Sequence, residues 1–224
     1  MIRTFATRDA AMDAAALRMA DALNTGIAAR GEAIAALSGG STPGPAYERL
    51  AQLPLDWSKI TFALIDERFV PLRDPASNEG LIRRTLAPAF AHGARLLPLY
   101  ADTLSVSAAA DLADPIYQPL IFDIALMGMG EDGHTASWFP GGDAAALAPN
   151  TTRSVMAVIA PAARDAAERL TVTYPLIQRS RSVLLLITGE AKRTALERAR
   201  GLSLEQAPVA ALFSERAPDV FWAP

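Results

Sequence analysis

The sequence has no cysteine and only two histidines, His92 and His134, among its 224 residues. Disulfides and thiolate metal sites are therefore excluded, and a histidine-rich zinc site is not expected. Carboxylates could still hold Mg²⁺ or Ca²⁺, but we expect no metal site.

Long apolar runs and an excess of positive charge are also missing. No apolar run reaches the about 18 residues that a membrane-spanning helix needs. The amino-terminal segment MIRTFATRDAAMDAA lacks the apolar core of a secretory signal. A net charge of −3 argues against a nucleic-acid binder, although it leaves room for a small basic pocket for a phosphate. We expect a cytoplasmic protein that binds neither nucleic acid nor membrane.

The composition is that of a folded globular protein. Hydrophobic residues make up 51% of the chain and charged residues 20%. A chain of this length can bury a sizeable core, and one large domain fits it better than two small ones. We find no internal repeat, low-complexity tract or linker, and we expect a single domain over residues 1–224.

Short apolar runs alternate with segments of helical periodicity. Strands are predicted at Ala33–Leu37, Ile60–Ile65, Phe122–Met127, Ser154–Ala160 and Ser182–Thr188. Helices are predicted at Asp9–Arg30, Pro45–Leu53, Ser77–Leu86 (with Ser77 or Asn78 as N-cap), Ser105–Asp114 and Gly189–Arg200. Runs such as VLLLI show no polar alternation, which is typical of strands covered on both faces. This pattern predicts an α/β, Rossmann-like fold with a largely parallel sheet flanked by helices on both faces.

Ligands of such sheets bind beyond the carboxyl ends of the strands, where polar loops gather. The first polar loop, LSGGSTPG, follows the strand Ala33–Leu37. Gly39 and Gly40 let a ligand approach the backbone, and Ser41 and Thr42 offer hydroxyls just before a helix. Together these groups suit an anion such as a phosphate, although neither a Walker loop nor a GxGxxG pattern is present. A plain Gly/Ser/Pro turn is the alternative.

The second polar loop, DERFVP, places three charges directly after an apolar strand. Such charges are costly to bury unless they face water or a partner. Arg68 could form a bidentate pair with a phosphate or a carboxylate. On this loop alone, an ion pair between Asp66 and Arg68 that caps the sheet is the simpler interpretation.

The third polar loop, GMGEDGH, is rich in glycine and places Asp132 two residues before His134. An imidazole with a nearby carboxylate is suited to act as a general base. His92, in FAHGAR, has no such surroundings. Lys192 lies at the start of the last predicted helix, where it is either solvated or a second cation for a phosphate.

Five segments, in this order, resemble motifs of the 6-phosphogluconolactonase family, within a wider group that includes the glucosamine-6-phosphate deaminases. They are LSGGSTP, DERFVP with SNEG after it, GMGEDGHTASWFPG, RLTVTYPLI and LITGEAK, and they run from about residue 37 to residue 192. Each segment alone is weak evidence for the family, but five such segments in the family's order are specific for it. The glycine-rich segment is the most diagnostic of the five.

The resemblance implies hydrolysis of 6-phosphoglucono-1,5-lactone to 6-phosphogluconate, the second step of the oxidative pentose phosphate pathway. It implies a sugar-phosphate isomerase type of fold and an enzyme without metal or organic cofactor. The expected partner is the small sugar-phosphate lactone alone. The sequence does not determine the oligomeric state, and we expect a monomer or a weak homodimer.

The resemblance also implies roles for individual residues. His134 would be the general base that activates water, with Asp132 orienting or polarising it. The residues expected to bind substrate are Gly39, Gly40, Ser41, Thr42, Asp66, Arg68, Asn78, Arg169 and Lys192. Either Arg164 or Arg169 could contact the phosphate, and the RLTVT match favours Arg169. Whether Asp66 takes part in chemistry or only orders Arg68 stays open.

Two positions bear on the alternatives. Trp138 stands where the family commonly has leucine, a change expected to affect only pocket packing. Phe139 stands five residues after His134, where the glucosamine-6-phosphate deaminases carry a glutamate, so deamination or isomerisation of an amino-sugar phosphate is the less favoured alternative. A non-catalytic sugar-phosphate sensor is the other alternative, but a sensor would not need both Asp132 and His134.

Overall fold

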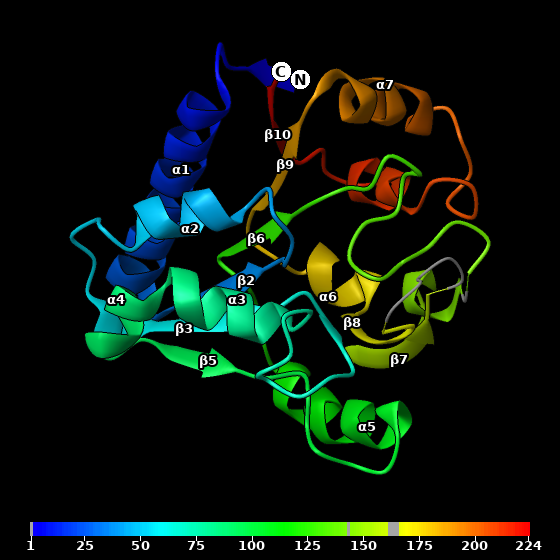
Figure 1. Cartoon of the computed structure of the whole chain (residues 1–224), viewed down its shortest axis with the longest axis horizontal. Coiled ribbons are helices and arrows are strands. Elements are labelled where there is room, and N and C mark those ends of the chain that lie inside the picture. The colour runs from blue at the N-terminus through cyan, green and yellow to red at the C-terminus, as the bar shows by residue number, and fades with distance from the viewer. Residues whose placement is uncertain (1, 143, 161–165) are drawn as a thin grey trace.

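A seven-stranded parallel sheet forms the centre of the protein (Figure 1). The structure, a computed structural model, describes residues 2–142, 144–160 and 166–224. The strand order is β1-β10-β9-β6-β2-β3-β5, and every adjacent pair is parallel. The strands are β1 (Ile2–Thr4), β2 (Ala33–Leu37), β3 (Ile60–Leu64), β5 (Arg95–Leu97), β6 (Ile124–Met127), β9 (Val183–Thr188) and β10 (Asp219–Ala223). The central strands β2, β3 and β6 are almost wholly buried, as expected for strands covered on both faces.

Helices pack on both faces of this sheet, which confirms the predicted α/β fold class. In Figure 1, α1 lies on one side of β9 and β10 and α7 lies on the other. The α-helices are α1 (Arg8–Arg30), α2 (Gly44–Leu50), α3 (Asn78–Thr85), α4 (Ala87–Ala91), α5 (Val106–Tyr117), α6 (Tyr174–Gln178) and α7 (Glu190–Ala199). Short 3₁₀ helices are η1 (Trp57–Lys59), η2 (Ala144–Leu147) and η3 (Pro208–Phe213). In the part of the chain that is described, every helix is too short or too polar to cross a bilayer.

Local signals explain where the helices begin and end. The side chain of Thr7 caps α1 by accepting from the amide of Ala10, and Gly31 ends the helix in the left-handed conformation. Ser77, one of the two predicted N-caps, caps α3 by accepting from the amide of Gly80. The predicted helix after Ser105 is α5, which continues to Tyr117, three residues beyond the expected end.

A second, antiparallel sheet was not predicted. It consists of β4 (Asp66–Arg68), β8 (Glu168–Val172) and β7 (Val155–Ile159), in that order. The predicted strand Ser154–Ala160 therefore exists as β7, but it belongs to this sheet and not to the parallel one. The DERFVP segment, expected to be a loop, begins as strand β4, because Asp66–Arg68 pairs with β8.

The strand order brings the predicted site loops to one edge. Strand β2 has β3 on one side and β6 on the other, so the chain reverses its direction of travel across the sheet at β2. Leu37, at the end of β2, is in register with Leu64 and Leu126, near the ends of β3 and β6. The loops after these three strands therefore meet above β2, and such a switch point is the usual ligand crevice of open α/β sheets.

Candidate active site

A cleft of about 240 Å³ lies at this edge of the sheet. It is lined by the loop after β2, by β4, by the start of α3, by the loop after β6 and by α7. Most of the residues predicted to form a site line it: Gly39, Gly40, Ser41, Thr42, Asp66, Arg68, Asn78, His134 and Lys192. Asp132 and Arg169 are not among the lining residues; Asp132 is connected to the cleft through its hydrogen bond to His134, and Arg169 through its pairing with Arg68. Arg164, the alternative phosphate arginine, lies outside the described residues.

Asp132 and His134 form a hydrogen-bonded pair in the loop after β6. Nδ1 of His134 lies 2.6 Å from Oδ1 of Asp132, and the same oxygen accepts from the backbone amide of His134 at 3.1 Å. A carboxylate can only accept, so Nδ1 carries the proton and Nε2 is the basic nitrogen. Among the described residues nothing hydrogen-bonds to Nε2. The pair is partly open to solvent, with side-chain exposures of 36% for His134 and 53% for Asp132.

Packing fixes the imidazole ring as well. A Cβ atom added at Gly130 would lie 2.3 Å from two ring atoms of His134 and 2.5 Å from the Asp132 carboxylate. Glycine at this position thus leaves the space that the pair occupies. On another side, the ring of Phe139 lies with its centroid 5.2 Å from that of His134. The hydroxyl of Thr135 donates to the carbonyl of Gly128 at 2.7 Å and holds the two ends of the loop together.

Trp138 does not line the cleft; it anchors the loop from below. Its side chain is 1% exposed, and its indole Nε1 donates to the carbonyl of Val172 in β8 at 2.9 Å. Its ring packs edge-on against Tyr174. The position thus affects how the loop after β6 packs on β8, not the lining of the cleft.

The loop after β2 presents free backbone donors. Among the described residues, the amides of Gly39, Gly40, Ser41 and Thr42 donate to no protein acceptor. Ser38 is committed elsewhere, because its hydroxyl donates to the carbonyl of Leu126 at 2.8 Å. Free amides in a tight turn before a helix are suited to bind an anion.

Two arginines lie opposite each other beside this loop. Arg68 in β4 is in register with Arg169 in β8, a like-charge pair that is unfavourable unless something neutralises it. Burial and the charge of Arg68 lower the pKa of Arg169. In both side chains the Nε–H group is buried without an acceptor. Buried unpaired donors of two adjacent cations indicate a place for an anion.

Asp66 and Arg68 form no direct ion pair in the described structure, so the simpler interpretation of DERFVP is wrong. Asn78 connects them instead. Its Nδ2 donates to the Asp66 carbonyl at 2.8 Å, and its Oδ1 accepts from Nη1 of Arg68 at 2.7 Å. The Asp66 carboxylate accepts from Ser137 in the loop after β6, at 2.7 Å. Gly39 is glycine because Asn78 fills its side-chain space: an added Cβ would lie 1.8 Å from Oδ1 of Asn78.

Glu67 is the residue that sequence reasoning missed. Its side chain is fully buried, and its two carboxylate oxygens accept from the amides of Arg68, Asn78 and Glu79 at 2.7 Å and from the hydroxyl of Ser77 at 3.1 Å. Burial raises the pKa of this carboxyl group, and the three backbone hydrogen bonds oppose that rise. Strand alternation was the available signal, because it turns Glu67 away from the face that Asp66 and Arg68 share.

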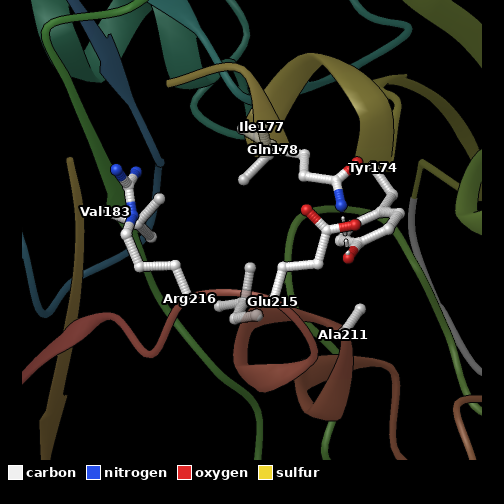
Figure 2. A pocket seen from close by; sticks show the side chains of 8 residues that line it. Tyr174, Ile177, Gln178, Val183, Ala211, Glu215 and Arg216 are labelled. Atoms are coloured by element: carbon white, nitrogen blue, oxygen red, sulfur yellow. Dashed lines mark hydrogen bonds between the residues drawn. The ribbon is translucent and has the colours of Figure 1, made fainter. Parts of the chain in front are cut away.

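A second cleft, of about 280 Å³, lies between α6 and η3 (Figure 2). Figure 2 shows Glu215 beside Gln178 and Tyr174 and Arg216 extending to the other side, near Val183. Val183 is the first residue of β9, so this cleft opens toward the amino ends of the strands. Its lining residues include no histidine paired with a carboxylate, so we place the active site in the cleft at the carboxyl edge.

Known proteins resemble this chain over nearly its whole length. The profile of the family described as glucosamine-6-phosphate isomerases/6-phosphogluconolactonase matches residues 6–222. A 6-phosphogluconolactonase of Mesorhizobium japonicum is 39% identical over 213 residues, which cover 92% of this chain and 88% of that protein. One of Pseudomonas aeruginosa is 39% identical over 215 residues, covering 93% and 89%.

Solved structures agree in fold. A crystal structure of a 6-phosphogluconolactonase from Shewanella baltica superposes with a TM-score of 0.94 at 32% identity, covering 100% of this chain and 97% of that one. A monomeric glucosamine-6-phosphate deaminase reaches a TM-score of 0.81 at 21% identity, a likeness of fold alone. On the length and identity of these matches, the chain belongs to the glucosamine-6-phosphate isomerase/6-phosphogluconolactonase family.

Proposed function

We propose that this protein hydrolyses 6-phosphoglucono-1,5-lactone to 6-phosphogluconate, in the oxidative pentose phosphate pathway. The observation that carries the proposal is one cleft that combines a histidine with a free Nε2 and a loop of free amides flanked by cations. A base beside an anion site suits hydrolysis of an ester that bears a phosphate. The protein would act in the cytoplasm as a monomer or a weak homodimer, without cofactor.

His134 is the proposed base. Its Nε2 takes a proton from water as the water oxygen attacks C1 of the lactone. Asp132 keeps the other ring nitrogen protonated and stabilises the imidazolium that forms. The bond between C1 and the ring oxygen then breaks, and the imidazolium returns its proton to that oxygen. A positioned base of this kind contributes about 10²–10⁴ in rate.

The phosphate would bind on the opposite side of the cleft. The amides of Gly39 to Thr42 and the ammonium of Lys192 line the cleft and would hold the phosphate, and Arg169, whose Nε–H is buried without an acceptor, would support them. Arg68 lies between the two sides and is suited either to the phosphate or to the oxyanion that develops at C1. Asn78, itself hydrogen-bonded to Asp66, holds Arg68 in place. Asp66 and Asn78 would also form hydrogen bonds with hydroxyl groups of the sugar.

Phe139 argues against the deaminase alternative. An apolar ring packs on His134 at the position where the deaminases carry a glutamate, so no carboxylate from that position is available to assist ring opening. A sensor that only binds a sugar phosphate would not need a histidine whose Nε2 is oriented by Asp132 and left unbonded among the described residues.

The test is turnover. Purified protein is given freshly prepared lactone, and the 6-phosphogluconate formed is measured through 6-phosphogluconate dehydrogenase. The spontaneous opening of the lactone is subtracted at each substrate concentration. Saturable hydrolysis above this background is expected, whereas a rate that does not depend on protein concentration would refute the proposal.

A further inference from the structure

We infer that Glu67 is a positioning residue that holds Arg68 and the start of α3 in the geometry needed to bind the substrate phosphate. The inference rests on the proposed function, since it assumes that Arg68 and the loop after β2 form the phosphate side of the cleft. Glu67 does not line the cleft, so it acts only through other residues.

Glu67 joins β4 to the start of α3, and it does so through more hydrogen bonds than any other side chain at this junction. One carboxylate oxygen accepts from the amides of Arg68, in β4, and Asn78, at the start of α3. The other oxygen accepts from Ser77 and from the amide of Glu79. Three backbone amides and one hydroxyl donate to this carboxylate, and a glutamine side chain in its place could not accept from all three amides.

The side chain of Arg68 depends on the same junction. Its Nη1 donates to the carbonyl of Ala76 and to Oδ1 of Asn78, both at 2.7 Å. Asn78 in turn lies directly against Gly39 in the loop of free amides. If α3 moves away from β4, Arg68 therefore loses both acceptors, and the loop loses the side chain that packs on it.

Charge and position predict opposite results when Glu67 is changed to glutamine. Burial and Arg68 lower the pKa of Arg169, and the negative charge of Glu67 is close enough to oppose that lowering. If Glu67 acted only through its charge, its removal would strengthen the binding of an anion. A glutamine amide, however, would present its NH₂ group to at least one backbone N–H, so at least one hydrogen bond is lost and the junction is weakened. A positioning role therefore predicts weaker binding.

The experiment compares Glu67→Gln with the matched variant Glu79→Gln. Glu79 is a second buried glutamate at the start of α3, but its carboxylate pairs with Arg83 on the outside of the same helix, at 2.7 Å. Calorimetric titration with 6-phosphogluconate measures affinity, titration with gluconate serves as the control without phosphate, and circular dichroism checks folding. We expect Glu67→Gln to weaken 6-phosphogluconate binding by about tenfold or more, and Glu79→Gln to change it by less than about twofold.

The charge-conserving variant Glu67→Asp tests the positioning role if Glu67→Gln does not fold. It keeps the negative charge but withdraws the carboxylate by one methylene group, so weaker binding is again expected. Unchanged or tighter binding in whichever variant folds, or an equal loss in Glu79→Gln, would overturn the inference. A wild-type protein that binds gluconate as tightly as 6-phosphogluconate would instead refute the phosphate site of the proposed function.

Discussion

The two sides of the cleft are built in opposite ways. On the catalytic side, Asp132 and His134 are joined by a short hydrogen bond and remain partly exposed. On the anion side, Glu67 is fully buried, Arg169 is nearly so, and Glu67 alone accepts four hydrogen bonds. The loop proposed to bind phosphate is itself open, since Gly40 and Ser41 are exposed, so the contrast lies in what supports each side. A proton acceptor has to reach water and keep one nitrogen free, whereas the residues that support an anion-binding loop have to stay fixed while no anion is present. Exposure suits the first task, and burial in a hydrogen-bonded network suits the second.

The largest expected effect comes from breaking the catalytic side. His134→Asn keeps a polar side chain but removes the base, so kcat should fall by about 10²–10⁴. The affinity for 6-phosphogluconate should change much less, because the anion side is untouched. Steady-state kinetics and product titration on the folded variant measure the two quantities. If His134 only braces its loop, the variant will instead lose thermal stability and keep more than about a tenth of kcat.

Displacing the catalytic pair without removing it should have a smaller effect. In Gly130→Ala the new methyl group collides with both His134 and Asp132, so the pair must shift and kcat should fall by about 10–10². Gly44→Ala is the control, because a Cβ there meets only side-chain atoms at 3.9 Å and beyond, outside the cleft. A normal kcat in Gly130→Ala would show that the position of this pair does not matter.

The anion side is tested at its lysine, which lines the cleft. Lys192→Ala should lower kcat/KM for the phosphorylated lactone by about 10–10², the value of one charge-assisted hydrogen bond. Hydrolysis of unphosphorylated gluconolactone, a poor substrate from the start, should change by less than about twofold. An equal loss of kcat/KM on the two substrates would show that Lys192 does not contact the phosphate.

Treatment with a chelator should have the smallest effect. The chain has no cysteine, and within the described ranges no three His, Asp or Glu side chains cluster as metal ligands would. We expect dialysis against a chelator to leave kcat unchanged. Loss of activity that one added divalent ion restores would require a metal-activated water in place of the His134 mechanism.

The sequence predicted the parts of this protein that depend on local patterns. Apolar runs located four of the seven strands of the parallel sheet, β2, β3, β6 and β9, but not the strands β1, β5 and β10. The Ser77 cap located the start of α3. Glycines and polar residues at strand ends indicated the loops of the cleft. The family resemblance assigned roles to His134 and to the anion loop, roles that stay predictions.

The parts that depend on pairing between distant segments were not predictable in this way. The three residues Asp66–Arg68 are too few to show a strand pattern, and they form β4 only because β8 lies beside them, about a hundred residues later. The partners of Glu67 and Asn78 follow from that pairing. For the same reason the sequence suggested an ion pair between Asp66 and Arg68, where the fold places an asparagine between them.

A crystal structure with 6-phosphogluconate bound tests most directly the claim that a base and a phosphate site face each other across the cleft. The product cannot be hydrolysed further, so it can be held at saturating concentration. We predict that its phosphate lies within about 3 Å of the amides of Gly40 to Thr42 and of the Lys192 ammonium, with its C1 carboxylate at Nε2 of His134. A phosphate bound at His134, or a ligand seated in the cleft between α6 and η3, would contradict the account.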